Sequence, residues 1–283
     1  MVDEAIKKAD VLIEAMPFIR KFNKKIFVIK YGGSILGEER VRKSVLEDIA
    51  FLRYTGVRPI LVHGGGPNIT KKLNSHKKSS QFVDGIRVTD EFTLRVVAEE
   101  LSKLNGMIVK EISSYGVQAV GLKINSKLLR AQKKQTKVDL GFVGDVVDFD
   151  SESLNKIVDE AIPVITPMGI SSEGVVYNIN ADEVACFIAA KLGAQKLVLL
   201  TNVLGVMRDP RQNSSLIPTI KVKEAKHLIA KKIIGEGMIP KVNAAIAAID
   251  GGVNKAHIVD ARISHAILLE IFTNRGIGTE VVK

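Results

Sequence analysis

The 283-residue sequence is poor in residue types that several classes of protein require. Its single cysteine, Cys186, rules out an internal disulfide and a thiolate-rich metal site. Tryptophan is absent and aromatic residues make up 5%, which disfavours stacking platforms for single-stranded nucleic acids. No apolar run reaches the roughly 18 residues that span a bilayer. We therefore expect neither a nucleic-acid nor a membrane partner.

Several common catalytic signatures are also missing. The chain has no G-x-x-x-x-G-K-S/T, and no G-x-G-x-x-G follows the first expected strand. Without a G-x-S-x-G, the run His63–Gly66 has no lipase-type oxyanion role, and His63 is expected to shape its own loop. The five histidines lack metal-ligand spacing, so we expect no metal held by side chains.

The charge and the N-terminal residues bear on partners and location. The net charge of +10 could suit nucleic acid, a membrane surface or small anionic substrates. Because the lysines are spread along the chain, we interpret most of them as solvated surface with a bias toward anionic ligands. Residues 1–20 are acidic in part and lack an apolar h-region, so we expect no signal or transit peptide. The expected location is the cytoplasm, with the plastid stroma as the alternative.

Two strand–glycine–helix units predict an α/β fold. Residues 26–29 form an apolar, β-branched run that leads into Lys30 and the pair Gly32–Gly33. Residues 58–62 form a second such run and lead into His63–Gly66. At the carboxyl edge of an open sheet, a lysine and exposed backbone donors suit a phosphate. One loop alone could be a tight turn before a solvated lysine, but two at equivalent strand ends favour a phosphate-handling cleft.

Arg87 lies in the polar run Asp84–Asp90, ahead of a long helix. Its guanidinium could hold a carboxylate through two parallel hydrogen bonds. A surface arginine paired with Asp84 or Asp90 is an equal alternative.

Asp182 and Lys241 each lie in the first turn of an expected helix. Asn180 is a suitable N-cap for the helix over 181–192, and the helix dipole stabilises a carboxylate at Asp182. Stabilising the start of this helix would by itself explain an aspartate at position 182. Lys241, in the helix over 240–249, opposes the dipole, and such a local violation indicates function.

The remaining pattern predicts an amphipathic helix over 2–16 whose apolar stripe needs a partner, either its own domain or another subunit. Other expected elements are helices over 41–54, 91–115, 222–232 and 265–274 (capped by Ser264), strands over 117–123, 141–147, 162–167, 175–178, 196–200 and 256–260, and a loop or hairpin over 125–138.

Five motifs, in order along nearly the whole chain, resemble the acetylglutamate kinases of the amino acid kinase family: Lys30–Gly33, His63–Pro67, Asp84–Thr89, Asn178–Asp182 and Gly237–Lys241. The resemblance implies an open three-layer αβα sandwich around a mainly parallel eight-stranded sheet. It implies an oligomerisation helix at 1–20, an acetylglutamate-binding and dimerising lobe at 21–194, and an ATP-binding lobe at 195–283, which would also hold an arginine site.

The implied reaction transfers a phosphoryl group from ATP to the γ-carboxylate of N-acetyl-L-glutamate, giving N-acetyl-L-glutamyl 5-phosphate in arginine biosynthesis. ATP would carry Mg²⁺ held mainly by its phosphates. The acceptor carboxylate, with a pKa of about 4.3, is already ionised at neutral pH, so no general base is needed. The difficulty is repulsion between anions, which lysines and backbone amides relieve.

The matched motifs also imply site residues. Lys30 and Lys241 would be the two transition-state lysines, and Asp182 would organise them. Arg87 would hold the α-carboxylate and Asn178 the acetylamino group. Gly65 and Gly66 would contact the substrate, and the implied phosphate and nucleotide positions are Gly32, Gly33, Gly64, Asn202, Gly205, Gly237 and Met238. Two departures from the family pattern, Glu236 for a glycine and Asn202 for an aspartate, concern ATP binding.

The N-terminal helix resembles that of the arginine-inhibited members of the family, and so does the C-terminal run made of His265, Leu268, Leu269, Glu270, Gly276, Ile277, Gly278 and Thr279. The resemblance implies feedback inhibition by L-arginine at His265, Glu270, Gly276 and Gly278, with Glu270 contacting the guanidinium, and a homohexamer built as a trimer of dimers. In photosynthetic organisms such enzymes also bind the PII signalling protein, and the sequence leaves open whether this one does.

Three other functions remain as alternatives. The first is a kinase of the same fold that acts on acetyl-aminoadipate, aspartate or another acidic amino acid; Arg87 within its motif favours acetylglutamate instead. The second is a non-catalytic arginine sensor, against which the joint presence of Lys30, Asp182 and Lys241 argues. The third is a nucleic-acid binder, which rests on charge alone.

Overall fold

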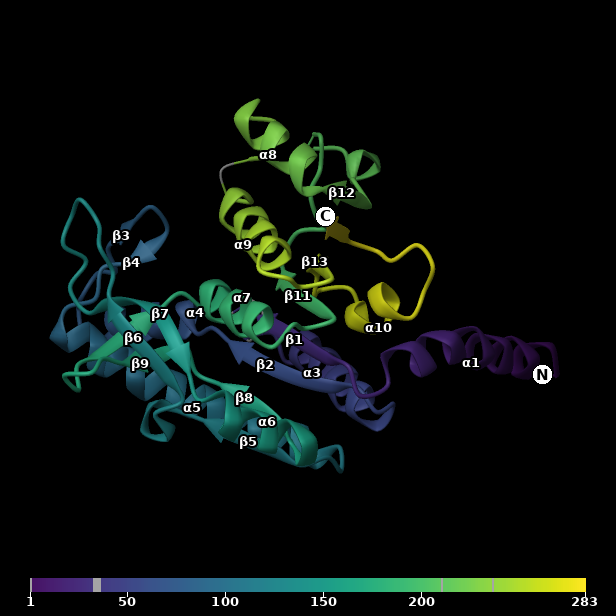
Figure 1. Ribbon diagram of the computed structural model, residues 1–283, viewed down its shortest axis with the longest axis horizontal. Helices are drawn as coiled ribbons and strands as arrows, with labels where there is room; N and C mark the ends of the chain where they lie inside the picture. Colours follow the sequence, from purple (N-terminus) through teal and green to yellow (C-terminus); the bar gives the residue numbers. More distant parts are fainter. Residues whose placement is uncertain (1, 33–36, 210, 236) are drawn as a thin grey trace.

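The centre of the structure is one eight-stranded sheet (Figure 1). The computed structural model describes residues 2–32, 37–209, 211–235 and 237–283. In these residues the strand order is β12 (Thr219–Lys221), β14 (Thr279–Val282), β13 (Lys255–Asp260), β11 (Lys196–Thr201), β1 (Ile26–Tyr31), β2 (Arg58–His63), β8 (Ile162–Ile165) and β5 (Ala119–Leu122). Only the pair β13–β14 is antiparallel, which confirms the predicted mainly parallel sheet.

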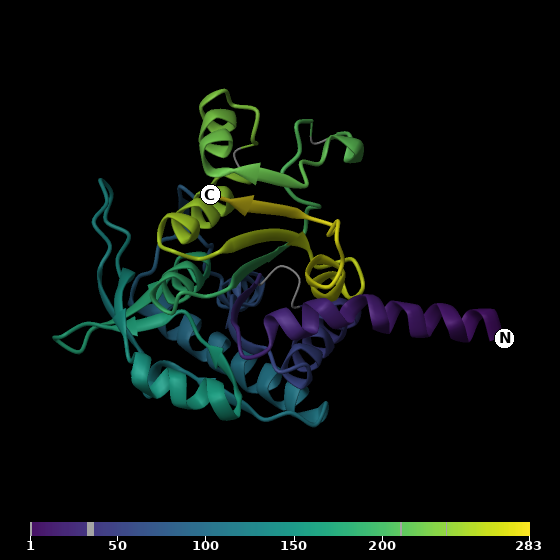
Figure 2. The same ribbon diagram turned by 45° about the vertical axis from the view of Figure 1, so that its right-hand side comes forward.

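Helices cover both faces of the sheet, as Figures 1 and 2 show, so the predicted three-layer αβα arrangement is confirmed. One face carries α6 (Ser151–Glu160), α7 (Ala181–Lys191), α8 (Val222–Ala230) and α9 (Ile239–Asp250). The other carries α1 (Val2–Phe22), α3 (Glu39–Tyr54), α5 (Glu91–Ser114) and α10 (Ala266–Ile271). A third core cluster joins α5 to α4 (Gly66–Ser75).

Alternation along the strands decides which face each site residue meets. In β1, Val28 packs on the α7 and α9 face, whereas Phe27 and Ile29 pack on the α3 face. Because side chains alternate with a period of two, Lys30 shares the face of Val28. In β2, His63 shares the α5 face with Leu61. At the carboxyl edge of the sheet, Lys30 therefore lies on the α7 and α9 face, and His63 lies on the α5 face.

Four short strands form a second sheet that closes on itself in the order β10 (Val176–Ile179), β7 (Val143–Phe149), β6 (Leu129–Lys133) and β9 (Met168–Ile170). The expected loop or hairpin over 125–138 begins within the short turn η1 (Ile124–Ser126) and contains β6. A separate hairpin, β3 (Phe82–Val83) and β4 (Ile86–Arg87), replaces the polar loop expected there. A second short turn, η2, covers Asn213–Ser215.

Helix α1 is longer than expected and has two differing halves. Its C-terminal half packs on the body, where Phe22 is buried and lies edge-on to Phe27 at 5.2 Å between ring centroids. Its N-terminal half projects from the body (Figure 2), and Val11, Leu12 and Ile13 are 64–66% exposed. The apolar stripe therefore has no partner within the described part of a single chain.

The expected C-terminal helix was wrong in its bounds and its cap. Helix α10 begins at Ala266, and its N-cap is His265 in the left-handed region (φ 56°), not Ser264. Contacts with α3 hold this residue: its N–H donates to Ser44 Oγ, and its Nδ1 lies 2.7 Å from Asp48 Oδ1. Tertiary contacts replace the side-chain cap that the sequence suggested. No helix in the described residues is long and apolar enough to cross a membrane.

Candidate active site

Lys30, Asp182 and Lys241 meet at the carboxyl edge of the sheet. Lys30 Nζ lies 2.9 Å from Asp182 Oδ1, and Lys241 Nζ lies 3.5 Å from Oδ2 of the same carboxylate. The three residues come from the end of β1 and from the first turns of α7 and α9. The structure thus brings together the three residues expected to be catalytic, with the carboxylate between the two ammonium groups.

The electrostatics of this cluster depend on its burial. Burial by itself raises the pKa of Asp182, but the charges of Lys30 and Lys241 outweigh it, and the net shift is downward. Burial and the charge of Lys30 lower the pKa of Lys241. Asn180 Oδ1 accepts the N–H of Asp182 at 2.8 Å as the predicted N-cap. The carboxylate is therefore ionised and rigidly placed, and it screens two lysines that would otherwise repel each other.

Two cavities lie on either side of the cluster. The first, of about 220 Å³, is lined by Lys30 and Asp182 together with the glycine loop, Arg87 and Asn178. The second, of about 320 Å³, is lined by Lys241 and by residues after β11 and before α9. The two positive charges are thus placed between two spaces, as a group transfer between two bound molecules requires.

Arg87 is the cation of the first cavity. It is 7% exposed, its Nη2 donates to Thr70 Oγ1 at 2.9 Å and to Gly66 O at 3.1 Å, and its guanidinium lies 4.7 Å from the Phe82 ring centroid. Nη1 donates to the hydroxyl of Ser80. The described residues give it no carboxylate partner. Burial lowers the pKa of Arg87, although a guanidinium stays charged. This buried, unneutralised cation suits an anionic ligand.

The alternative in which Arg87 pairs with an aspartate at the surface is not what the structure shows. Asp90 caps α5 through the N–H of Thr93 and forms an ion pair with Lys78. Asn178, which lines the same cavity, donates from Nδ2 to Thr89 Oγ1 at 3.2 Å. Its amide is therefore held in place beside the cavity that Arg87 also lines.

The glycine loop after β2 contributes backbone rather than side chains. A Cβ on Gly65 would lie 2.7 Å from Leu101 Cδ2, whereas a Cβ on Gly66 would meet no atom within 4 Å. Gly64, Gly65 and Gly66 all line the first cavity. Gly65 is thus required by packing against α5, and Gly66 leaves room for a ligand.

These two glycines give a matched pair of variants. We expect Gly65→Ala to lower the free energy of unfolding by about 1–3 kcal/mol, because the methyl group overpacks against Leu101. Gly66→Ala should leave the melting temperature nearly unchanged and cut kcat/KM for the first-cavity ligand by about tenfold, because it fills ligand space. Thermal melts and steady-state kinetics check both. Equal destabilisation by the two substitutions would contradict this distinction.

The second cavity holds most of the expected nucleotide positions. Asn202, Gly205, Gly237 and Met238 line it. Gly32 directly follows β1 and is buried, and it does not line either of these two cavities. Gly33 and Glu236 lie outside the described residues. Three lining side chains that the motifs did not identify are apolar: Val203, Met207 and Ile234. They could pack on a flat heterocycle.

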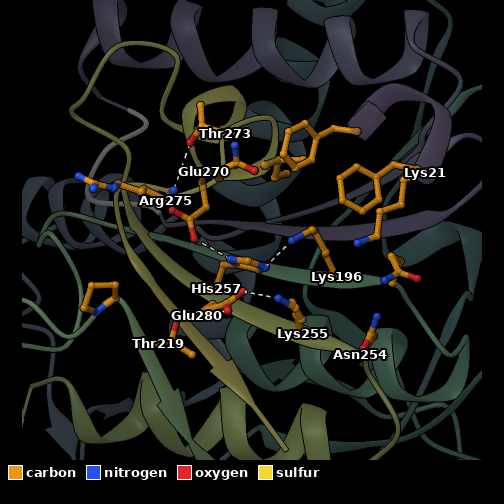
Figure 3. A pocket seen from close by; sticks show the side chains of 17 residues that line it. Lys21, Lys196, Thr219, Asn254, Lys255, His257, Glu270, Thr273, Arg275 and Glu280 are labelled. Carbon is orange, nitrogen blue, oxygen red and sulfur yellow. Dashed lines mark hydrogen bonds and ion pairs between the residues drawn. The ribbon is translucent and has the colours of Figure 1, made fainter. Parts of the chain in front are cut away.

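A third cavity, of about 180 Å³, lies between the end of α1, the sheet and α10 (Figure 3). Of the four residues implied for an arginine site, Glu270 and Gly276 line it, but His265 and Gly278 do not. His265 instead borders an open hollow beside α3. The N–H of Gly278 donates to Glu270 Oε2 at 2.9 Å.

Three buried polar side chains that line this third cavity are linked to one another. Lys196 Nζ lies 2.8 Å from His257 Nε2, and His257 Nδ1 lies 2.7 Å from Glu270 Oε1 (Figure 3). Burial and the charge of Lys255 lower the pKa of Lys196 to about 8. Sequence reasoning missed Lys196 and His257. A signal was present for His257, which stands between the apolar residues Ala256 and Ile258 of β13, whereas Lys196 only begins β11.

Comparisons with known proteins agree with this geometry. Residues 25–260 match the amino acid kinase family. The acetylglutamate kinase of Desulforamulus reducens is 45% identical over 282 residues, covering 98% of each chain. The structure of N-acetylglutamate synthase from Neisseria gonorrhoeae with coenzyme A and N-acetyl-glutamate superposes with a TM-score of 0.88 at 26% identity, over 97% of this chain and 63% of that one. The same synthase with coenzyme A and L-arginine gives a TM-score of 0.84 at 25% identity, over 97% and 65%. With this match over most of its length, and with two lysines and an aspartate between two cavities, the chain belongs to the amino acid kinase family.

Proposed function

We propose that the chain transfers the γ-phosphoryl group of ATP to the γ-carboxylate of N-acetyl-L-glutamate, a step of arginine biosynthesis. The observation that carries the proposal is the Lys30–Asp182–Lys241 cluster between an Arg87-lined cavity and a partly apolar one. The 45% identity to an acetylglutamate kinase over 98% of both chains supports the choice of substrate. Small soluble substrates also agree with the cytoplasmic location expected from the sequence.

The geometry supports an in-line displacement. The α-carboxylate of the acceptor would pair with Arg87 and its acetylamino group would meet Asn178, which leaves the γ-carboxylate directed toward Lys30. One of its oxygens attacks the γ-phosphorus, the bond to the β–γ bridging oxygen breaks, and ADP leaves with the electron pair. Lys30 and Lys241 would stabilise the charge on the transferring group, together with amides of the glycine loop.

The proposal divides the chain between the two substrates. Residues 21–194 supply Lys30, Arg87 and Asn178 and would bind the acceptor, while residues 195–283 supply Lys241 and the lining of the second cavity and would bind the nucleotide. A Mg²⁺ ion would arrive on the phosphates of ATP, where it neutralises charge.

The decisive test is ADP release from Mg·ATP with N-acetyl-L-glutamate, compared with aspartate and acetyl-aminoadipate. We expect turnover that depends on acetylglutamate, with formation of the acyl phosphate trapped as a hydroxamate. Faster turnover with another acid would move the substrate assignment to that acid. No turnover with any acid, from protein that still binds arginine, would favour the sensor.

We further propose that L-arginine inhibits this reaction by binding in the third cavity. Glu270 offers a carboxylate at its wall, and the cavity is bordered by Phe18, Lys21 and Phe22 of α1 (Figure 3). The exposed apolar half of α1 would pair with α1 of another subunit and link dimers into a hexamer. Arginine would thus bind next to the element that joins subunits.

Glu270→Gln tests the regulatory proposal. The substitution removes the negative charge proposed to pair with the guanidinium, so the arginine concentration for half-inhibition should rise by about tenfold or more. Glu152→Gln, at an exposed position of α6, is the control and should behave like the unchanged protein. Arginine-insensitive activity in the unchanged protein, together with dimers alone in light scattering, would refute the proposal.

A further inference from the structure

A buried polar cluster that the proposed reaction does not use lies beneath the glycine loop. It consists of His63 at the end of β2, Asn105 in α5 and Thr166 after β8. His63 and Asn105 are 0% exposed and Thr166 is 3% exposed. Burying a polar side chain destabilises the fold unless it is hydrogen-bonded. These three side chains bond to one another and to backbone, while Asn105 Oδ1 has no partner among the described residues.

The hydrogen bonds of Asn105 fix the tautomer of His63. Asn105 Nδ2 donates to Val164 O at 2.8 Å, and a carbonyl can only accept, so the amide orientation is determined. The same NH₂ group faces His63 Nε2 at 3.3 Å and Thr166 Oγ1 at 3.2 Å. One amide hydrogen serves Val164 O and the other is shared between Nε2 and Oγ1, so Nε2 accepts and the single proton of a neutral ring is on Nδ1. Burial lowers the pKa of His63 to about 4, which keeps the ring neutral.

The proton on Nδ1 has a defined target. His63 Nδ1 lies 3.1 Å from the carbonyl oxygen of Gly64, so the ring donates to it. The N–H of Gly64 donates to Tyr31 O at 2.9 Å. The backbone of Gly64 is thus held from both sides, by β1 and by the ring of His63, although glycine itself would allow many conformations.

Peptide geometry carries this restraint to the active site. The Gly64–Gly65 peptide is trans and planar, so its C=O and N–H point in opposite directions. Since the C=O is directed to the buried ring, the N–H of Gly65 is directed away from that ring. Gly65 also lines the first cavity. This N–H has no hydrogen-bond partner in the described part of the chain, so it is free to meet a ligand.

We infer that His63 is a positioning residue for phosphoryl transfer: by holding the Gly64 carbonyl, it aims the Gly65 N–H at the transferring phosphoryl group. This inference rests on the proposed function. The ring does not touch substrate and moves no proton. It preorganises a donor, which costs no rearrangement at the moment of reaction.

Two isosteric variants separate this role from simple core filling. Asn places an amide NH₂ where Nδ1 stands in the ring, so His63→Asn keeps the donor to Gly64 O. Gln places its amide nearer to Nε2, so His63→Gln loses that donor. We expect His63→Gln to lower kcat by about 10- to 100-fold and His63→Asn by less than about threefold, with KM for ATP little changed in both. Equal losses of kcat in variants of equal melting temperature would overturn the inference.

A measurement on the unchanged protein tests the geometry independently of activity. In ¹⁵N-labelled protein, the His63 ring should be neutral from pH 6 to pH 8 with its proton on Nδ1. A proton on Nε2 would refute the inference even if the enzyme is fully active. Inactivity of the unchanged protein toward all acids would instead refute the proposed function and leave the tautomer result to stand alone.

Discussion

Lys30→Ala and Lys241→Ala are each expected to lower kcat by about 10²–10³, the usual effect of removing one donor that stabilises charge in a transition state. Both ammonium groups contact the Asp182 carboxylate at rest, at 2.9 Å and 3.5 Å. As charge develops on the transferring phosphoryl group, each lysine can exchange part of that contact for a phosphoryl oxygen. Steady-state kinetics with saturating Mg·ATP and acetylglutamate give the comparison.

The control for both variants is Lys226→Ala. Lys226 is exposed on α8 and pairs with Asp250 outside either active-site cavity, so its loss should leave kcat unchanged. Circular dichroism and thermal melts should show that the two active-site variants keep the fold, because Asp182 retains one lysine partner in each. An unaltered turnover number in either variant would remove that lysine from the catalytic assignment.

The sequence predicted the arrangement around β1 because several local signals agreed there. An apolar run, a terminal lysine and glycines placed Lys30 at the carboxyl edge, and the N-cap Asn180 placed Asp182 at the start of a helix. A parallel sheet then brings such strand ends and helix starts to one edge. What the local pattern could not give is the distance between Lys241 and Asp182, which depends on how α9 packs against α7.

Elements that depend on pairing rather than on local pattern escaped prediction. Strand β12 spans three residues and has one buried side chain, Ile220, between two exposed ones, so only its pairing with β14 makes it a strand. Helix α6 was missed although Asp150 caps it through the N–H of Ser153. His265, which the motif assigned to the arginine site, is instead held at the start of α10 by Asp48 of α3, a contact that no local signal reveals. His257 of β13 lines the third cavity.

Arg87 showed the limit of local reasoning most clearly, because a surface ion pair and a ligand contact were equally compatible with its motif. The fold decides between them: β3 and β4 form a hairpin that turns Arg87 inward, over Phe82 and against Thr70 of α4. Of the two aspartates that were possible partners, Asp90 instead caps α5. Nothing in the spacing of the motif fixes that choice, since it depends on the hairpin and on two helices together.

Arg87→Ala should raise KM for acetylglutamate by about 10²-fold or more, because it leaves a carboxylate in a partly buried cavity without its cation. KM for ATP should stay within about twofold of that of the unchanged protein, because Arg87 does not line the second cavity. Arg87→Lys should also be impaired, by about tenfold or more, since an ammonium group cannot reproduce the planar fork or the stacking on Phe82. Arg95→Ala, an exposed arginine on α5, is the matched control and should change neither KM.

The distribution of the effect between KM and kcat makes this experiment informative. A contact to the α-carboxylate is made equally in the ground state and the transition state, so its loss should appear mainly in KM. A fall in kcat at unchanged KM would mean that Arg87 contacts the transferring phosphoryl group instead. That result would reverse the orientation proposed for the acceptor in the first cavity, with its γ-carboxylate toward Arg87, and would separate Lys30 from the reacting atoms.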